Sequence, residues 1–379
     1  MTVGWECKQL GEVLRLEYGK PLPDENRAVA GRYAVYGANG EKARSNRFYH
    51  DKRSIIVGRK GSAGEINLTE EKFWPLDVTY FATFDETRHD LKFLYYLLDT
   101  LDLPSMARGV KPGINRNDVY ALGVAIPPLP EQQTIVGILD AAFAGIAAAK
   151  ANAEHNRQNA RALFDGHRQA VLDRRDGSWA KTNLGAEIEL LVGFAFKSAG
   201  YVNSDESTRL LRGDNIIQGS IRWDDAKRWP LEDCSAYQRF ELRLGDVVLA
   251  MDRPWVKAGL KRAMISLDDL PLLLVQRTAS LRCREKLDNR YLFHLISGNG
   301  FIRHLLGVQT GTGVPHISGQ QIKDFEFARP SLSEQKRIAD DLDALDAETQ
   351  HLESLYTRKL AALAELKQSL LRQAFSGAL

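Results

Sequence analysis

The sequence predicts an α+β protein in which two mixed α/β domains are separated by two long helices that form an antiparallel coiled coil within one chain. Three observations carry this prediction. A short segment recurs about half-way along the chain, each copy precedes a long stretch with helical periodicity, and the segments around the first stretch lack such periodicity. A chain of 379 residues, 44% hydrophobic, is also too long for one ordinary core.

The recurring segment is PPLPEQQTIVGIL at 127–139 and PSLSEQKRIADDL at 330–342, an offset of 203 residues without a gap. At the same offset upstream, Pro112-Gly113-Ile114-Asn115 corresponds to Pro315-His316-Ile317-Ser318. The organisation is therefore globule, helix, globule, helix. The predicted bounds are 1–127, 128–178, 179–330 and 331–379.

Both segments after the repeats are expected to form coiled-coil helices, because their apolar positions alternate in steps of four and three. In the second helix this seam runs from Ile338 to Leu370. Alanine occupies four seam positions of the first helix where the second has bulkier residues, which favours close pairing within one chain. The first seam comprises Ile135, Leu139, Ala142, Ile146, Ala149, Ala153, Asn156, Ala160, Leu163 and His167.

Each predicted helix spans about 40 residues and therefore on the order of 60 Å. An antiparallel pair of that length would carry the globules to opposite ends and act as a ruler. Asn156 and Lys359 interrupt the two seams at matching positions and are candidates for setting the register. A coiled coil between two chains, or local helices with solvated ends, is the alternative.

The composition limits the classes of function. The net charge is +2, so a basic surface must come from local clustering. Cys7, Cys234 and Cys283 show neither a disulfide framework nor zinc spacing, which favours a reducing, cytoplasmic location. The start lacks the pattern of a secretion signal, and no stretch approaches the roughly 20 apolar residues of a membrane span, so we expect a soluble protein without a membrane partner.

Three clusters could contact nucleic acid. The first is GRKGSAG at 58–64, where a glycine-rich hairpin after an apolar strand would expose backbone N–H groups beside Arg59, Lys60 and Ser62. That combination suits phosphate oxygens or guanine edges. A plain basic hairpin is the simpler interpretation of this cluster alone. It is not a nucleotide-phosphate loop, because the Gly-Lys-Ser/Thr ending and the following helix are missing.

The second cluster surrounds Trp255 and combines charge with the donor patterns that read adenine or guanine. It comprises Arg253, Lys257, Lys261, Arg262, Gln276 and Arg277. A solvated basic face is an equal alternative. The third cluster is the pair of glycine-containing turns that precede the repeats, at 108–113 and 310–315. Their occurrence at the same place in both halves favours a function.

Two polar turns complete the candidates, although Asn-Gly is more often a simple turn former. They are Tyr36 with Asn39 and Arg212 with Asn215. The full predicted DNA-binding set is Tyr36, Asn39, Arg59, Lys60, Ser62, Lys111, Asn115, Arg212, Asn215, Arg253, Lys257, Lys261, Gln276, Arg277, Thr310 and His316.

Familiar catalytic motifs are missing from the sequence. It contains no Gly-x-Ser-x-Gly elbow, no His-Glu-x-x-His and no Gly-x-Gly-x-x-Gly, and its histidines show no metal spacing. We therefore expect no catalytic site, and no metal or cofactor bound by this chain. A nuclease site without a fixed sequence pattern is an alternative that the missing motifs do not exclude.

Taken together, these residues resemble the specificity (S) subunits of type I restriction–modification systems over essentially the whole chain. The strongest carriers are Pro-Leu-Pro-Glu-Gln-x-x-Ile at 128–135, its partner at 331–338, and Arg-Gln-Ala-Phe-Ser-Gly at 372–377. The first globule resembles one family of recognition domain in its motifs at 18–23, 36–40, 58–64 and 73–75. The globule at 179–330 resembles a different family of recognition domain in its motifs at 193–198, 211–216, 245–251 and 274–277.

The resemblance implies two target-recognition domains that each read one half of a split, asymmetric double-stranded DNA site, with the helices fixing the unread gap. It implies that two methyltransferase (M) subunits dock on the helices, bind S-adenosylmethionine and methylate adenine. Restriction (R) subunits that use ATP and magnesium could join them. A coiled-coil scaffold with peptide-binding globules, or a self-contained DNA methyltransferase or nuclease, is the alternative.

Overall fold

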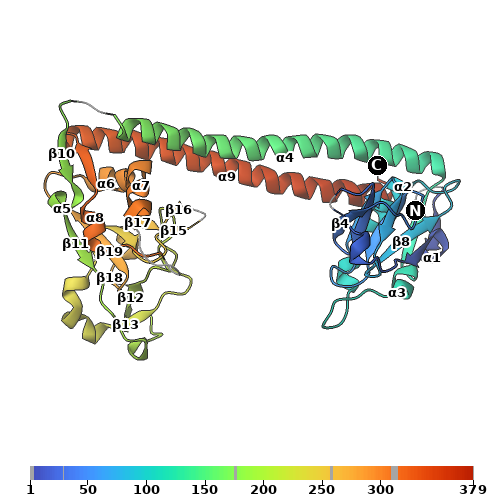
Figure 1. The fold of residues 1–379 in the computed structure, drawn as a ribbon, viewed down its shortest axis with the longest axis horizontal. Helices are drawn as coiled ribbons and strands as arrows, with labels where there is room; N and C mark the ends of the chain where they lie inside the picture. The colour runs from blue at the N-terminus through green and yellow to red at the C-terminus, as the bar shows by residue number, and fades with distance from the viewer. Residues whose placement is uncertain (1–3, 29, 175–176, 257–258, 309–314, 379) are drawn as a thin grey trace. The chain divides into compact units, whose positions relative to one another are not determined.

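The computed structural model describes residues 4–28, 30–174, 177–256, 259–308 and 315–378. It divides into two compact units, one formed by Met1–His155 with Thr357–Leu379 and the other by Asn156–Tyr356. Helix α4 (Leu129–Leu172) begins in the first unit and ends in the second, whereas α9 (Leu332–Ser376) does the reverse (Figure 1). The predicted fold class, mixed α/β domains with two long helices, is confirmed.

The described part of the first unit has three small sheets and three short α-helices besides the long ones. The first sheet pairs β1 (Glu6–Gln9) with β9 (Gly123–Ile126). The second has four strands in the order β2 (Leu14–Tyr18), β8 (Thr79–Phe84), β5 (Ser54–Gly58) and β6 (Ile66–Thr69). The third has three strands in the order β4 (Gly40–Ser45), β3 (Tyr33–Gly37) and β7 (Phe73–Pro75). All pairs are antiparallel except β3 with β7. The short helices are α1 (Leu10–Val13), α2 (Leu91–Thr100) and α3 (Arg116–Tyr120).

The second unit repeats this topology. Its sheets are β10 (Ala180–Asn183) with β20 (Glu326–Arg329), then β11 (Ile188–Val192)–β19 (Thr278–Cys283)–β14 (Val247–Ala250)–β17 (Arg262–Met264), then β13 (Arg228–Pro230)–β12 (Ser207–Leu211)–β18 (Leu272–Leu274). A hairpin of β15 (Trp255–Val256) and β16 (Gly259–Leu260) is added. Its helices are α5 (Leu184–Glu187), α6 (Asn289–Ser297), α7 (Asn299–Val308) and α8 (Gly319–Lys323). The duplication seen in two short segments therefore extends through both globules.

The first turn of each long helix contains a glutamine whose side chain is fully buried. The amide nitrogen of Gln132 donates to the carbonyl oxygens of Pro127 (2.8 Å) and Arg88 (3.0 Å), and its amide oxygen accepts from the N–H of Asp90 (2.9 Å). Asp90 is in turn the N-cap of α2. The amide therefore joins the start of α4 to the start of α2, and every polar atom involved is satisfied.

Gln335 makes the same three bonds in the second unit. It donates to the carbonyl oxygens of Pro330 (2.9 Å) and Lys286 (3.0 Å) and accepts from the N–H of Asp288 (2.9 Å), the N-cap of α6. The glutamates just before these glutamines also correspond, because Glu131 accepts from the indole of Trp5 and Glu334 from that of Trp179. This shared joint is the physical reason why Glu-Gln recurs in the two repeats.

A second contact of each long helix with its globule lies two turns further along. In the first unit Asp140 accepts from Lys92 (2.7 Å) and from the hydroxyl of Tyr96 (2.5 Å). Burial raises the pKa of Asp140, but these two hydrogen bonds outweigh it and hold that pKa below its ordinary value. The carboxylate therefore stays charged and fixes the face that α4 presents to α2.

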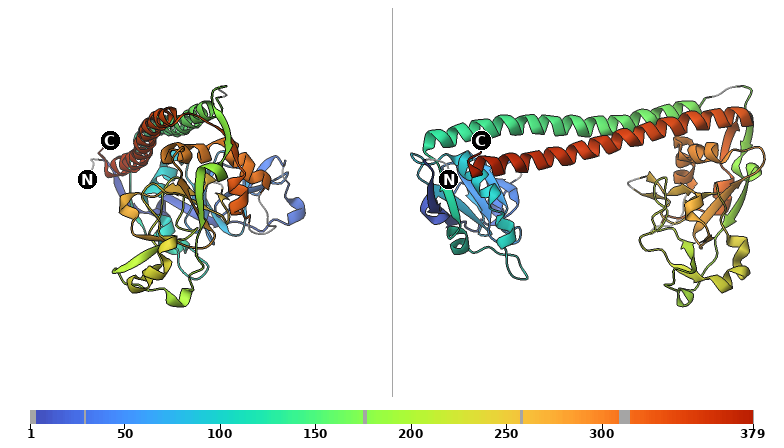
Figure 2. Two further views of the ribbon diagram at one scale, coloured as in Figure 1. Left: turned by 90° about the vertical axis from the view of Figure 1, so that its left-hand side faces the viewer. Right: turned by 180° about the vertical axis from the view of Figure 1, so that it is seen from behind.

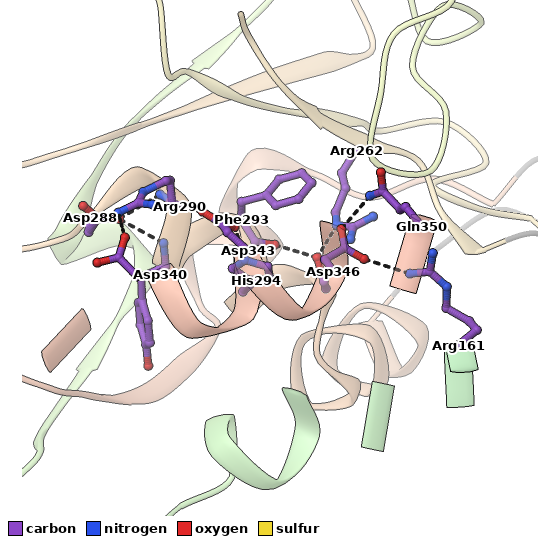
Figure 3. A network of polar contacts seen from close by, with 12 residues as sticks. Arg161, Arg262, Asp288, Arg290, Phe293, His294, Asp340, Asp343, Asp346 and Gln350 are labelled. Carbon is purple, nitrogen blue, oxygen red and sulfur yellow. Dashed lines mark hydrogen bonds and ion pairs between the residues drawn. The ribbon is translucent and has the colours of Figure 1, made fainter. Parts of the chain in front are cut away.

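The corresponding carboxylate of the second unit is Asp343. It bonds His294 (2.7 Å) and Arg290 (3.1 Å), both on α6 (Figure 3). Burial lowers the pKa of His294, an effect that the Asp343 carboxylate opposes. Chemically different partners thus make an equivalent joint in the two units.

The two long helices pair antiparallel within each unit (Figures 1 and 2). In the first unit Ile135 and Leu139, near the start of α4, share a core with Leu371, near the end of α9. In the second unit Phe164 of α4 shares a core with Leu342, and Arg161 pairs with Asp346 at 3.0 Å (Figure 3). The predicted antiparallel pairing within one chain is confirmed.

The predicted seam is wrong over the last part of α4 and at three positions of α9, where Leu345, Leu352 and Leu366 are exposed. Leu163 is 74% exposed and His167 is also exposed, whereas the neighbouring Phe164 is 2% exposed. A straight helix has 3.6 residues per turn, so a strict 3.5-residue pattern drifts by about 20° per heptad and the inward face passes to the next residue. Asn156 and Lys359 lie exposed, so they do not set the register.

The prediction that no stretch approaches the apolar length of a membrane span also needs correction. An 18-residue window of α4 has a mean hydropathy of 1.6, so by length and composition this helix could cross a membrane. Core helices of water-soluble proteins pass the same test. The start of α4 packs on the first globule. Asp140 accepts from Lys92 of that globule, and Ile135 and Leu139 are buried in its core.

Replacing Gln132 by leucine tests the buried joint. The change leaves two carbonyl oxygens and one N–H without partners inside the protein, so we expect the free energy of unfolding to fall by about 2–4 kcal/mol. The measurement is a urea titration of the full chain. Gln133→Leu is the matched control, because that adjacent glutamine is exposed and its loss should change stability by less than about 0.5 kcal/mol. Equal losses in the two variants would contradict the assignment.

Candidate nucleic-acid interface

The first two predicted clusters occupy equivalent places in the duplicated fold. Loop 59–65 follows β5, and residues 251–254, which lead into β15, follow β14. The two strands end in the same register, because Gly58 pairs with Thr79 and Ala250 pairs with Thr278. Clusters that share no sequence similarity are therefore carried by the same scaffold position.

In the first unit the loop after β5 is hydrogen-bonded to the predicted turn at 108–113. The N–H of Gly61 donates to the carbonyl of Pro112 (2.9 Å), and the N–H of Ile114 donates to that of Arg59 (3.1 Å). Gly61 and Gly109 have φ values of 81° and 92°, which side chains rarely adopt. The first cluster and the 108–113 turn of the third cluster thus form one surface that exposes Lys60 and Lys111. The other turn of the third cluster lies outside the described residues except for Pro315.

An exposed tyrosine ring lies beside two guanidinium groups on this surface. Tyr18 is 47% exposed, and its ring centroid is 5.4 Å from Cζ of Arg59 and 4.7 Å from Cζ of Arg116. Arg59 also donates from Nε and Nη2 to the carbonyl of Asp77 (3.0 and 2.6 Å). Such fixed cations beside an aromatic face suit contact with a nucleic acid.

Sequence reasoning did not single out Tyr18 or Arg116 for this surface. The two residues are about 100 positions apart, and their stacking follows from the packing of α3 against β2, where Arg116 donates to the carbonyl of Leu16 (3.1 Å). The one sequence signal for Tyr18 is its position, because it begins the motif at 18–23, and the structure places it at the end of β2.

The remaining candidates of the first unit have mixed environments. Asn39 is exposed in the turn between β3 and β4, and Ser62 is half-buried. Tyr36 is half-buried, with its ring edge-on to Phe73 at 5.9 Å. Asn115 caps α3 by accepting from the N–H of Asn117 (2.9 Å), so its amide oxygen has a structural role.

In the second unit three segments meet at the end of β14. The N–H of Met251 donates to the carbonyl of Arg277 (2.9 Å), and the N–H of Arg253 donates to that of Pro315 (2.7 Å). Asp252 and His316 form an isolated antiparallel bridge. The candidates Arg253, Arg277 and His316 are thereby brought together, although they are far apart in the sequence.

Lys261 lies beside this group. Burial lowers its pKa, and the positive charges of Arg253 and Arg222 lower it further, while Asp214 acts in the opposite direction. Gln276 is exposed in the turn before β19. Lys257 and Thr310 lie outside the described residues.

The second polar turn is largely a structural element. Asn215 is only 5% exposed, accepts from the N–H of Arg212 (3.1 Å) and donates to the carbonyl of Arg222 (3.1 Å). Its burial argues against a direct contact with DNA, because both ends of the amide close the turn. Arg212 pairs with Asp214 at 3.3 Å and keeps its place among the candidates.

The described residues contain no group of three or more His, Cys, Asp or Glu side chains arranged to hold a metal ion. The arrangement in each unit is a surface of fixed cations and exposed polar turns. Such a surface can attract phosphates and offer hydrogen-bond donors to base edges.

Comparisons with known proteins agree with this geometry. The family model described as the type I restriction modification DNA specificity domain matches residues 2–154 and 257–359. The specificity subunit of the type I restriction enzyme EcoAI from Escherichia coli is 35% identical over 168 residues, which are 44% of this chain and 28% of that protein. The MjaVIII specificity subunit from Methanocaldococcus jannaschii is 23% identical over 90% of this chain and 86% of its own length.

Solved structures share the fold over the whole chain. A chain from a structure of a type I R-M system has a TM-score of 0.78 at 19% identity and covers 100% of this chain and 99% of its own length. The HsdS subunit from Thermoanaerobacter tengcongensis has a TM-score of 0.60 at 19% identity, with coverages of 100% and 98%. Since the family model also matches more than half of the sequence, this chain belongs to the family of type I restriction–modification specificity subunits, and its two globules are target-recognition domains.

Proposed function

We propose that this chain reads a bipartite, asymmetric site on double-stranded DNA, one half-site per target-recognition domain. The observation that carries the proposal is the equivalence of the two candidate loops. Lys60 and Asp252 occupy the same scaffold position, since they form matching bridges with Gly113 and His316. One duplicated fold that presents unlike side chains at the same place is suited to reading two unlike sequences.

Catalysis belongs to other subunits in this proposal. The chain binds no cofactor, and two methyltransferase (M) subunits supply S-adenosylmethionine chemistry, with restriction (R) subunits, ATP and magnesium where the system also cleaves. The complex works in the cytoplasm. Methyl transfer or DNA nicking by the purified chain alone would contradict this division of labour.

The docking of M subunits on the long helices is supported by exposed apolar side chains there. Leu163 is 74% exposed, and six others lie between 36% and 47%. These are Ile138, Leu332, Leu345, Leu352, Leu355 and Leu366. Exposed apolar side chains on a helix suit contact with another protein.

Removing two exposed lysines from the first domain tests the half-site assignment. Lys60→Ala with Lys111→Ala should weaken binding to the first half-site about tenfold for any sequence there, because the loss is of phosphate attraction. The slope of log affinity against log salt should fall by roughly one per lysine. The measurement is titration of short duplexes that each contain only one of the two half-sites.

The control for this test is Lys52→Ala. Lys52 is also exposed but precedes β5, at the opposite end of the strand from loop 59–65. It should leave both half-sites unaffected. A loss shared equally by the two half-sites would refute one domain per half-site.

A charge on the exposed helix face tests docking. Leu163→Glu should abolish co-purification of the methyltransferase subunit without lowering the unfolding temperature of the free chain, because Leu163 contributes little to its core. Ala162→Glu is the control, since that residue is also exposed but points about 100° away around the helix. Loss in both variants, or in neither, would contradict docking through Leu163.

A further inference from the structure

One carboxylate in the second target-recognition domain ties together side chains from two distant segments. Asp252 Oδ2 accepts from Nη1 of Arg277 (2.5 Å), and Oδ1 is hydrogen-bonded to Nδ1 of His316 (2.6 Å). Burial raises the pKa of Asp252, but the bonds and charges of His316 and Arg277 outweigh it, so that pKa lies below its ordinary value. The carboxylate is therefore charged, and both of its oxygens are engaged.

The cluster is not needed to build the fold. In the first domain the N–H of Arg59 donates to the carbonyl of Val78 (2.8 Å), as that of Met251 does to Arg277 (2.9 Å). Val78, Lys60 and Gly113 therefore occupy the positions of Arg277, Asp252 and His316. The same backbone connections form there without any of the three side chains, so the cluster is a property of the second domain alone.

Arg277 combines an open side chain with an unusual backbone. Its side chain is 63% exposed, whereas that of Asp252 is 25% exposed. Its φ of 62° lies in the left-handed region, which non-glycine residues enter only when the surroundings enforce it. The residue is held in place at its backbone and at Nη1, while most of its side chain is exposed to solvent.

We infer that Asp252 is a positioning residue that holds Arg277 for a bidentate contact with a guanine in the second half-site. This inference rests on the proposed function. A guanidinium offers two parallel donors that match O6 and N7 of guanine in the major groove. Pinning one corner of the fork in advance reduces the freedom lost on binding. Contact with a phosphate alone would not require such a fixed orientation.

The chemistry of Asp252 also favours positioning over direct reading. A carboxylate that reads cytosine must accept from its N4 amino group. Oδ2 of Asp252 already accepts from Arg277, and Oδ1 is already hydrogen-bonded to His316. Arg277 is the most exposed of the three side chains and the one that can offer two parallel donors to a base.

The test measures base preference at every position of the second half-site. The full chain, assembled with its methyltransferase subunits, selects from duplexes with a fixed first half-site and a randomised second one. Arg277→Ala should reduce discrimination in favour of guanine at one position by roughly 10- to 100-fold and leave the other positions unchanged. Asp252→Asn should relax the same position. Arg277→Lys should retain affinity better than alanine without restoring the preference, because lysine is a point charge.

The control is Asp341→Asn, which removes a carboxylate from another exposed Asp–Arg pair, Asp341 with Arg337 at 3.3 Å on α9. Its base preferences should match those of the unaltered chain. Uniform weakening by Arg277→Ala, full preference with Arg277→Lys, or an unaltered preference with Asp252→Asn would overturn the inference. Absence of any second half-site preference in the unaltered complex would instead refute the proposed function.

Discussion

A buried glutamine amide at the start of each long helix is the constraint on which the rest of the structure depends. Gln132 and Gln335 each satisfy three backbone groups that would otherwise be buried without partners, and in doing so they fix the direction in which α4 and α9 leave their globules. The aspartates two turns on, Asp140 and Asp343, prevent rotation about that joint. Polar groups with one geometry make a more specific joint than apolar packing alone.

The duplicated joints leave the loops at the ends of β5 and β14 free to differ. Their backbone connections are the same, but the side chains they present are basic in the first domain and built around Asp252 in the second. A scaffold that is constant where it meets the helices and variable where it meets solvent separates assembly from recognition. In the proposed function, this separation lets one scaffold present two different recognition surfaces.

Much of this architecture was predictable from the sequence, because the repeat and the helical periodicity are local signals. The antiparallel pairing followed from them, and the basic character of loop 59–65 followed from its own residues. The duplication of the globules did not, since equivalent strands share a pairing order but little sequence. Three further features were not predictable from local patterns. The inward position of Phe164 depends on helix geometry over many residues, and the stacking of Tyr18 with Arg116 depends on contacts between distant segments. The burial of Asn215 depends on the surrounding fold.

We propose that the paired helices set the separation between the two half-sites. Inserting one heptad into α4 and one at the facing point of α9 lengthens the pair by about 10.5 Å, which corresponds to roughly three base pairs of DNA. Mapping methylated adenines in DNA modified by the complex measures the outcome directly. The account predicts two unchanged half-sites with a gap about three base pairs longer. An unchanged gap, or a change in the bases read, would contradict it.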